Sequence, residues 1–424
     1  MHIFWFILYN TILYPLLFFC VSAFSLFSGK TRKSVYGKFG SIKILKSYFK
    51  QNRKNIDIYW FHASSLGEFY QIKPVLESLK TQKPRSRILM SFTSPSGYDN
   101  VHSDLIDLKF YMPFDFLWSV NRALDIVCPN KVIFASYDYW PNFLWISSLK
   151  GIYTKIFAYR FKQSTFKTFP VVSNFFKSIY RFVDVICTVS KEDERFFMLH
   201  FGLLNTPTLK VMGNPRYDMV QKAVKDCDHD MQPDDYIRII IGSAHEEEEY
   251  ILIKSLSKLM RSYPDIKIVY VPHEPKRDEI DRIKSKFKHE GFLTTVFNKK
   301  NDLALPNDQL VVVGIVGVLS RLYWQSSIAY IGGGFSTGIH NVMEPAVAGI
   351  PVLFGPRYDH AHEAGELLSV SGGFVVNNAA EFTEKMTELI EDSTQLQISG
   401  LAARDAIHKN SGSTEKIVES ILNE

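Results

Sequence analysis

The chain has 424 residues, of which 46% are hydrophobic and 22% are charged, and this globular composition excludes a disordered or fibrous protein. Because this length exceeds that of one ordinary core, we expect two domains. Four widely separated cysteines (Cys20, Cys128, Cys187 and Cys227) form no metal-binding or redox motif, which excludes a disulfide framework and is typical of a reducing compartment.

The net charge of +5 conceals an asymmetry along the chain. Residues 1–230 carry 30 Lys and Arg against 17 Asp and Glu, whereas residues 231–424 carry 19 against 27. A basic half indicates an anionic partner, either a membrane surface or a nucleic acid, unless the charges are scattered at random. No known nucleic-acid-binding motif is present, so we expect a membrane surface and no nucleic acid.

The first segment in chain order is a run of 25 uncharged residues from Ile3 to Phe27. A helix of this length can cross a bilayer or lie tilted in its interface, although Asn10 and Pro15 would loosen it. Four Lys and Arg residues follow within eleven positions and none precedes the run, which predicts an uncleaved anchor with a cytoplasmic body. We therefore expect residues 1–28 to be a membrane anchor that can be deleted without unfolding the remainder.

Strand-like and helix-like segments alternate through the rest of the chain. Residues 57–62 form an apolar run that ends in a turn of small residues, and residues 68–80 then show the apolar spacing of a helix. Such alternation predicts parallel sheets with crossover helices, that is, an α/β fold. The other strand-like runs are residues 87–92, 131–135, 154–159, 184–189, 238–241, 266–271, 310–313, 328–331 and 351–354.

A polar, turn-rich segment at residues 226–235 divides these runs into two series and predicts a linker. We therefore expect an N-terminal Rossmann-like domain at 29–225 and a C-terminal one at 236–424, whose last helix can pack back on the first domain. Doubly wound domains bind ligands beyond the carboxyl ends of their strands, here in a cleft where the two parallel sheets face each other.

The most informative segment follows the run at 328–331. Its notable positions are three consecutive glycines and, on a predicted helix, three polar side chains: Gly332, Gly333, Gly334, His340, Asn341 and Glu344. Glycines allow a phosphate to approach the backbone, and a helix N-terminus offers it free N–H groups. Asn341 and Glu344 would share a helix face and could bind one ribose or sugar. A glycine-rich turn alone fits a tight turn without a ligand equally well.

A series of motifs in one order is more specific. Asn341-x-x-Glu344-Pro345, followed by Ala-Gly-Ile-Pro-Val and Gly-Pro, resembles the nucleotide-sugar half of GT-B glycosyltransferases, and in detail the 3-deoxy-D-manno-octulosonic acid (Kdo) transferase family. The segments 62–68 (HASSLGE) and 140–142 (WPN) resemble further motifs of that family. The sequence departs from the family at Ser136, Asp138, His273, Glu274, Gly314 and Ile339.

The resemblance implies an inverting glycosyltransferase that moves Kdo from CMP-Kdo to a hydroxyl of a lipid A precursor (lipid IVA), early in lipopolysaccharide core synthesis. It implies Glu68 as the general base, since the acceptor hydroxyl must lose its proton as the new bond forms. The partners are then CMP-Kdo, the lipid A precursor and the cytoplasmic leaflet of the inner membrane, with no cofactor and no metal. For the nucleotide sugar it implies Ser243, His245, Arg277, Gly332, Gly333, Gly334, His340, Asn341 and Glu344, and for the acceptor Asp138 and Arg160.

Alternatives remain open at this point. Another GT-B enzyme could use a CMP- or UDP-sugar on a different membrane lipid, and a two-domain sugar-binding protein would lack catalysis altogether. The second would normally carry a cleavable signal, against which the charges after the apolar run argue. Glu68 also suits a purely structural role at a helix start, Ser243 that of an N-cap, and His340 that of an ordinary helix histidine.

Overall fold

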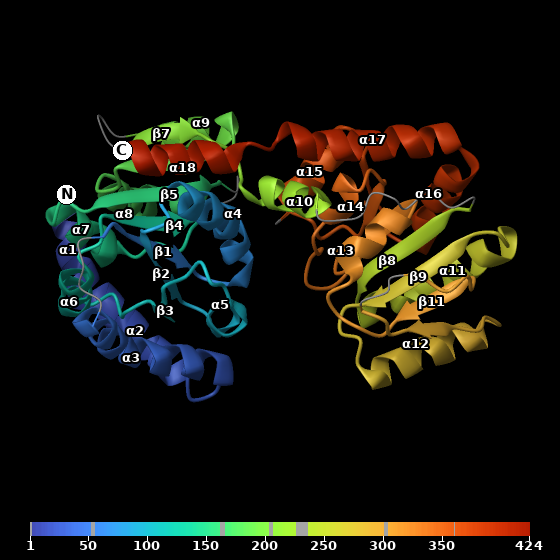
Figure 1. The fold of residues 1–424 in the computed structure, drawn as a ribbon, viewed down its shortest axis with the longest axis horizontal. Coiled ribbons are helices and arrows are strands. Elements are labelled where there is room, and N and C mark those ends of the chain that lie inside the picture. The colour runs from blue at the N-terminus through green and yellow to red at the C-terminus, as the bar shows by residue number, and fades with distance from the viewer. Residues whose placement is uncertain are drawn as a thin grey trace. The chain divides into compact units, whose positions relative to one another are not determined.

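The computed structural model describes residues 2–51, 56–161, 166–202, 207–225, 236–300, 304–359 and 361–424. The chain forms two compact units, one of residues 1–219 with 411–424 and one of residues 220–410. Each unit is a sheet flanked by helices (Figure 1). The linker predicted at 226–235 lies outside the described residues.

Unit 1 is built on a sheet of seven parallel strands in the order β3-β2-β1-β4-β5-β6-β7. The strand order reverses direction between β1 and β4, and ligands of doubly wound sheets bind at such a switch point. The strands are β1 (Ile58–Ala63), β2 (Arg87–Phe92), β3 (Leu108–Tyr111), β4 (Lys131–Ala135), β5 (Tyr153–Tyr159), β6 (Val185–Thr188) and β7 (Thr208–Val211).

Helices cover both faces of this sheet, and its central strands are therefore buried on both sides. One core cluster contains Leu45, Val120, Phe143 and Ile179, and the other contains Phe69 and Ile417. The helices are α3 (Gly29–Gln51), α4 (Leu66–Gln82), α5 (Pro95–Asn100), α6 (Leu117–Val127), α7 (Pro141–Leu149), α8 (Pro170–Tyr180), α9 (Lys191–Phe201) and α18 (Ser413–Asn423), with a short 3₁₀ turn at Phe166–Thr168. The helix α10 (Arg216–Lys225) begins in unit 1 and ends in unit 2.

The last helix, α18, belongs to unit 1 although unit 2 precedes it in the chain. Its apolar residues Ile417, Val418 and Ile421 are buried in the same cluster as α4. Its start is fixed by Asp218, whose carboxylate accepts hydrogen bonds from the backbone N–H groups of Gly412 and Thr414. Unit 1 therefore draws part of its core from the end of the chain.

Unit 2 repeats the architecture with seven parallel strands in the order β10-β11-β9-β8-β12-β13-β14. Its switch point lies between β8 and β12. The strands are β8 (Arg238–Ala244), β9 (Lys267–Pro272), β10 (Thr295–Phe297), β11 (Leu310–Val313), β12 (Ile328–Ile331), β13 (Val352–Phe354) and β14 (Gly373–Val375). The helices are α11 (Glu249–Ser262), α12 (Arg277–His289), α13 (Leu319–Leu322), α14 (Met343–Val347), α15 (His362–Ser369), α16 (Ala379–Glu391) and α17 (Ser393–Lys409), with 3₁₀ turns at Glu246–Glu248 and Tyr323–Gln325.

The uncharged N-terminal run is helical from His2 to Phe24, and it is the one helix in the described parts of the chain that is long and apolar enough to cross a membrane. It consists of α1 (His2–Leu8), a π-helical turn (Tyr9–Leu13) and α2 (Tyr14–Phe24). The wide turn contains Asn10, whose side chain donates a hydrogen bond to the carbonyl of Phe6, and it ends just before Pro15, which lacks an N–H group. The two residues expected to loosen the helix therefore coincide with its irregular turn.

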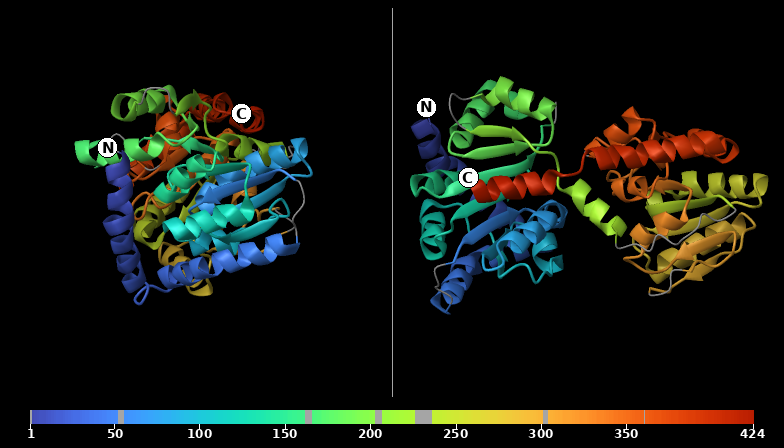
Figure 2. Two further views of the ribbon diagram at one scale, coloured as in Figure 1. Left: turned by 90° about the vertical axis from the view of Figure 1, so that its left-hand side faces the viewer. Right: turned by 45° about the horizontal axis from the view of Figure 1, so that its top comes forward.

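This N-terminal helix packs along one side of unit 1, and α3 then turns across the unit's edge (Figure 2, left). Tyr9 and Tyr14 are buried against the unit, and the Tyr9 hydroxyl donates a hydrogen bond of 2.9 Å to Asp115. The opposite face exposes apolar side chains: Ile3, Phe4, Ile7, Ile12, Leu16, Phe19 and Phe24. The helix is thus part of the unit 1 core as well as an apolar surface. Its deletion is therefore expected to destabilise unit 1, in contrast to the expectation from the sequence.

Candidate active site

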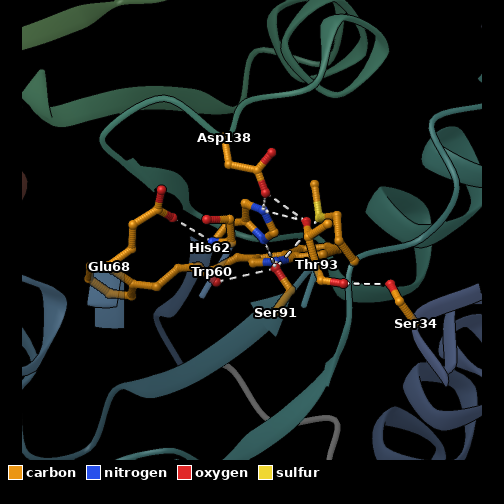
Figure 3. A network of polar contacts seen from close by, with 10 residues as sticks. Ser34, Trp60, His62, Glu68, Ser91, Thr93 and Asp138 are labelled. Carbon is orange, nitrogen blue, oxygen red and sulfur yellow. Dashed lines mark hydrogen bonds and ion pairs between the residues drawn. The ribbon is translucent and has the colours of Figure 1, made fainter. Parts of the chain in front are cut away.

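A hydrogen-bond network lies at the carboxyl ends of β1, β2 and β4 (Figure 3). His62, near the end of β1, is fully buried, and its Nε2 lies 3.0 Å from Oδ2 of Asp138. Its Nδ1 lies 2.9 Å from the Ser91 hydroxyl, and the Thr93 hydroxyl donates to the same Asp138 oxygen at 2.7 Å. The switch point between β1 and β4 therefore holds a carboxylate fixed by two neighbouring strands.

Asp138 is held in its ionised form by these contacts. Burial alone would raise the pKa of this carboxyl, but the hydrogen bond and charge of His62 and the hydroxyl of Thr93 hold it below its ordinary value. Asp138 was predicted as an acceptor-binding residue, whereas His62 was quoted only as part of a motif. The structure shows that His62 orients Asp138.

Glu68 lies in the first turn of α4, beside this network. One of its carboxylate oxygens accepts a hydrogen bond from the backbone N–H of Ser64, so the structural role expected of an acidic residue at a helix start is present. The other oxygen, Oε1, has no hydrogen-bond partner among the residues that the structure describes.

The surroundings of Glu68 suit a base. Burial raises the pKa of its carboxyl, and the charge of Asp138 adds to this effect, while the Ser64 N–H opposes it. A carboxylate whose pKa is raised toward neutrality accepts a proton more readily than an exposed one. The free oxygen and the raised pKa give Glu68 the two properties that a general base needs.

Arg160 follows β5 on the same side of unit 1. Its Nε is buried without a hydrogen-bond partner in the described part of the chain, an unusual state for a cationic side chain. The pKa of the neighbouring Tyr137 is raised mainly by burial, with Arg160 lowering it and Glu68 raising it, so both charges face the same hydroxyl. Ser136, where the family resemblance leads us to expect a glutamate, instead donates a hydrogen bond to Gln71.

In unit 2 the three glycines are required by the packing of strands. A Cβ atom on Gly332 would lie 2.2 Å from the carbonyl oxygen of Ser243, and one on Gly334 would lie 2.5 Å from Gly355. Gly333 has a φ of +93°, which favours glycine. These glycines thus have a structural reason to be present, and phosphate binding by them stays a prediction.

The prediction that a helix carries His340 and Asn341 is wrong, since α14 begins only at Met343 and has 5 residues. The preceding loop folds back on the strand, with the N–H of His340 bonded to the carbonyl of Gly332. The Asn341 side chain then accepts from the N–H of Met343 and donates to Glu344 at 2.9 Å. Asn341 and Glu344 are brought together as predicted, but by this turn and not by a shared helix face.

Three histidines meet at the carboxyl ends of β8, β9 and β12. His245 and His340 face each other with their Nε2 atoms 2.7 Å apart, and His273 stacks on both rings at 4.5 Å. The Ser336 hydroxyl lies 3.2 Å from Nδ1 of His245. Burial and the nearby His245 lower the pKa of His273, while Glu274 opposes this shift.

This histidine cluster has ligand atoms within 4.8 Å of one another, a set that could hold a transition-metal ion. The Nε2 contact is also accounted for by one N–H···N hydrogen bond between neutral rings. The absence of a metal therefore stays a prediction. The sequence analysis named His245 and His340 at the nucleotide-sugar site but not His273 beside them, because the three members are separated by 28 or more positions and share no local motif.

Two other residues predicted to bind the nucleotide sugar, Ser243 and Arg277, do not join the histidine cluster. Ser243 lies in β8 with a φ of +55°, at an irregularity in the pairing with β9, so it is not an N-cap. Arg277 begins α12 with its side chain 94% exposed and only a 4.0 Å ion pair to Asp281. The structure does not bring Arg277 into contact with the histidine cluster.

Comparison with known proteins agrees with the motifs. Residues 34–219 match the family described as 3-deoxy-D-manno-octulosonic-acid transferase (kdotransferase). The 3-deoxy-D-manno-octulosonic acid transferase of Aquifex aeolicus is 28% identical over 84% of this chain and 93% of its own length. The transferase of the same name from Haemophilus influenzae is 24% identical, covering 85% of each protein.

Solved structures share the fold at low identity. The UDP-GlcNAc 2-epimerase of Neisseria meningitidis has a TM-score of 0.62 at 14% identity, covering 87% of this chain and all of that one. Acinetobacter baumannii MurG has a TM-score of 0.59 at 14% identity with the same coverage. These likenesses confirm the α/β fold of GT-B type and nothing about activity, because an epimerase shares it. The matches in sequence show that the chain contains a Kdo transferase domain at residues 34–219 and is similar to curated Kdo transferases over most of its length.

Proposed function

We propose that the protein transfers Kdo from CMP-Kdo to a hydroxyl group of a lipid A precursor, with inversion at the anomeric carbon and release of CMP. The observation that carries the proposal is Glu68, a carboxylate with a raised pKa and a free oxygen beside the switch point of unit 1. We infer the identity of the sugar from the names of the relatives, and the catalytic roles from the residues of unit 1.

In the proposed reaction the acceptor oxygen attacks the anomeric carbon of Kdo as the bond to the CMP phosphate breaks. The acceptor proton passes to Glu68, which must be ionised to take it. Asp138, fixed by His62 and Thr93, accepts a hydrogen bond from a second acceptor hydroxyl. Arg160 offers its unpaired Nε to an oxygen of the acceptor.

We propose that unit 2 binds the donor at the carboxyl ends of β8 and β12. Asn341 and Glu344 would bind the ribose or the sugar, and His245 and His340 would lie beside the phosphate or the carboxylate. Ser243 and the three glycines would line the same site. Arg277 is exposed in the structure and would have to turn to contact the donor.

We also propose an inner-membrane location with the body on the cytoplasmic side, where the positive residues after the helix place it. One side of the N-terminal helix packs on unit 1, so lipid can surround only the opposite, apolar side. A helix embedded by one face in the cytoplasmic leaflet satisfies both observations.

The proposal is tested by incubating the purified protein with CMP-Kdo and the tetra-acylated lipid A precursor, followed by mass spectrometry of the lipid. We expect the mass of the lipid to increase by one or more Kdo residues. An increase only with a UDP-sugar or a different lipid would favour the second candidate, another GT-B transferase. The absence of any product with every donor would favour a sugar-binding protein.

Asn341→Ala and Glu344→Ala are each expected to raise the KM for CMP-Kdo by about 5- to 150-fold, the equivalent of a buried hydrogen bond worth 1–3 kcal/mol. The KM for the lipid should change less, because the lipid is bound by unit 1. Asn377→Ala is the matched control, since Asn377 also pairs with a glutamate, Glu381, but on the exposed start of α16. An unchanged donor KM in both variants would place the nucleotide elsewhere.

A further inference from the structure

Unit 1 contains a cavity of about 300 Å³ between α2, α3 and the loop after β2. Its wall is mainly apolar and includes Leu17, Phe18, Val21, Val35, Phe114 and Trp140. This volume lies at the lower end of the range of about 300–1,000 Å³ typical of small-molecule sites. Neither the motifs nor the proposed chemistry assigns the cavity a role.

The cavity is continuous with the exposed apolar face of the N-terminal helix. Leu17 and Val21 line the cavity, yet they are 44% and 38% exposed, so the same side chains reach the outer surface of α2. Phe19 and Phe24 extend that surface along the helix. A hydrocarbon chain can therefore pass from a lipid layer into the cavity without crossing a polar surface.

The wall also contains the cationic side chain of Lys38. The Lys38 ammonium lies 4.8 Å from the centre of the Trp140 ring, and no carboxylate among the described residues lies within ion-pair distance of it. Burial lowers the pKa of Lys38, while the more distant charges of Asp138 and Asp115 oppose this shift. A cation without a carboxylate partner is costly in apolar surroundings, and an anionic oxygen group in the cavity would pair with Lys38.

The cavity also adjoins the network of the candidate active site. Thr93 lines the cavity, and its hydroxyl donates to Asp138. Its backbone carbonyl accepts a hydrogen bond from Ser34 of α3. The cavity and the candidate active site therefore share Thr93.

We propose that this cavity binds one acyl chain of the lipid acceptor, and that Lys38 binds an anionic oxygen group, such as a phosphate, next to that chain. The proposal rests on the proposed function, in that the acceptor is an acylated, phosphorylated glycolipid. The apolar wall, its continuity with the membrane-facing helix and the unpaired cation together fit this chemistry. An apolar peptide segment could pack against the apolar wall of the cavity but would supply no anionic group for Lys38.

The test measures binding of the lipid alone, without a donor, by native mass spectrometry of the full-length protein in detergent. Val21→Trp fills the cavity, and we expect it to weaken binding of the tetra-acylated precursor at least tenfold. Leu16→Trp, on the same helix but outside the cavity and 59% exposed, should bind as the wild type does. The deacylated precursor should not distinguish the two variants. Equal binding of the acylated precursor by Val21→Trp and Leu16→Trp would overturn the acyl-chain assignment.

Binding of the anionic headgroup by Lys38 is tested with Lys38→Met, which is one atom shorter, stays unbranched and removes the charge. We expect at least fivefold weaker binding of the phosphorylated precursor and no change with the dephosphorylated lipid. Lys33→Met is the control, since Lys33 is an exposed residue of the same helix paired with Asp99. Equal loss with both lipids, or no loss, would overturn the assignment of Lys38.

Melting curves separate these effects from misfolding, and Val35→Phe offers a second way to fill the cavity if Val21→Trp melts at a lower temperature. Because the assay contains no CMP-Kdo, its outcome does not depend on transfer. If Kdo is not transferred but lipid binding still depends on the cavity, only the proposed function is overturned. If Kdo is transferred but Val21→Trp does not weaken lipid binding, only the cavity proposal is overturned.

Discussion

Glu68→Gln is expected to lower kcat by about 10²–10⁴-fold, the usual contribution of a general base, while the Kd for CMP-Kdo stays unchanged. The amide keeps the size of the side chain, and its oxygen can still accept the hydrogen bond from the Ser64 N–H. It cannot take a proton from the acceptor. The measurement is a single-turnover rate with saturating lipid, together with donor binding by calorimetry.

The pH dependence of the same reaction gives an independent check. Burial raises the pKa of Glu68 above its ordinary value of 4.5, and the base must be ionised to act. The wild-type rate should therefore be constant at high pH and fall as the pH drops through this raised pKa. The acid limb should disappear in Glu68→Gln.

Glu77→Gln is the matched control, since Glu77 lies on the same helix, α4, but further along it. It should keep the wild-type kcat and the acid limb. The assignment of Glu68 would be wrong if Glu68→Gln kept more than roughly a tenth of the wild-type kcat, a change of only about 1.4 kcal/mol in the barrier.

The strands of the fold were largely predictable from local sequence, and the exceptions have physical reasons. Runs such as 87–92 and 131–135 coincide with β2 and β4, because strands buried on both faces are continuous apolar segments. The sequence analysis missed β3, which has 4 residues, β7, whose side chains are half exposed, and β10 and β14, which have 3 residues each. β10 and β14 are the edge strands of the sheet of unit 2, and β3 and β7 are those of unit 1. The apolar pattern is weakest at such edges.

The candidate site was predictable only where its residues lie in one motif. Glu68 and His62 stand in a single segment, and Asn341 and Glu344 are three positions apart. The histidine cluster joins residues from three strand ends, which only the strand order brings together. Lys38 was counted as one more positive residue after the anchor, and no local pattern shows that its side chain lies over Trp140.

Asp115 explains why the N-terminal helix cannot be treated as a detachable anchor. Its carboxylate accepts hydrogen bonds from the backbone N–H groups of Asn142 and Phe143 at 3.0 and 3.1 Å and from the Tyr9 hydroxyl at 2.9 Å. The Tyr14 hydroxyl accepts a bond from the Asp115 N–H. The same carboxylate therefore fixes the start of α7 and holds the N-terminal helix on unit 1.

Asp115→Ala is expected to destabilise unit 1 by about 3 kcal/mol or more, because three buried donors lose their acceptor at about 1–3 kcal/mol each. For a unit of this size that corresponds to a fall in Tm of about 6–12 °C. Thermal melting in detergent measures the effect. Asp125→Ala, which removes an exposed carboxylate paired with Lys150 on the same unit, should shift the Tm by no more than about 2 °C.

The result also decides how the protein is held at the membrane. If the helix were a free tether surrounded by lipid, Tyr9 and Tyr14 would not contact Asp115. Asp115→Ala would then lose only the hydrogen bonds from Asn142 and Phe143, and a deletion of residues 1–24 would leave the Tm of unit 1 unchanged. If the helix is part of the core, a deletion of residues 1–24 should lower the Tm of unit 1 at least as much as Asp115→Ala does, since it removes Tyr9 and Tyr14 as well. Binding to the membrane and folding of the acceptor unit would then be inseparable, because the apolar face and the buried tyrosines belong to one helix.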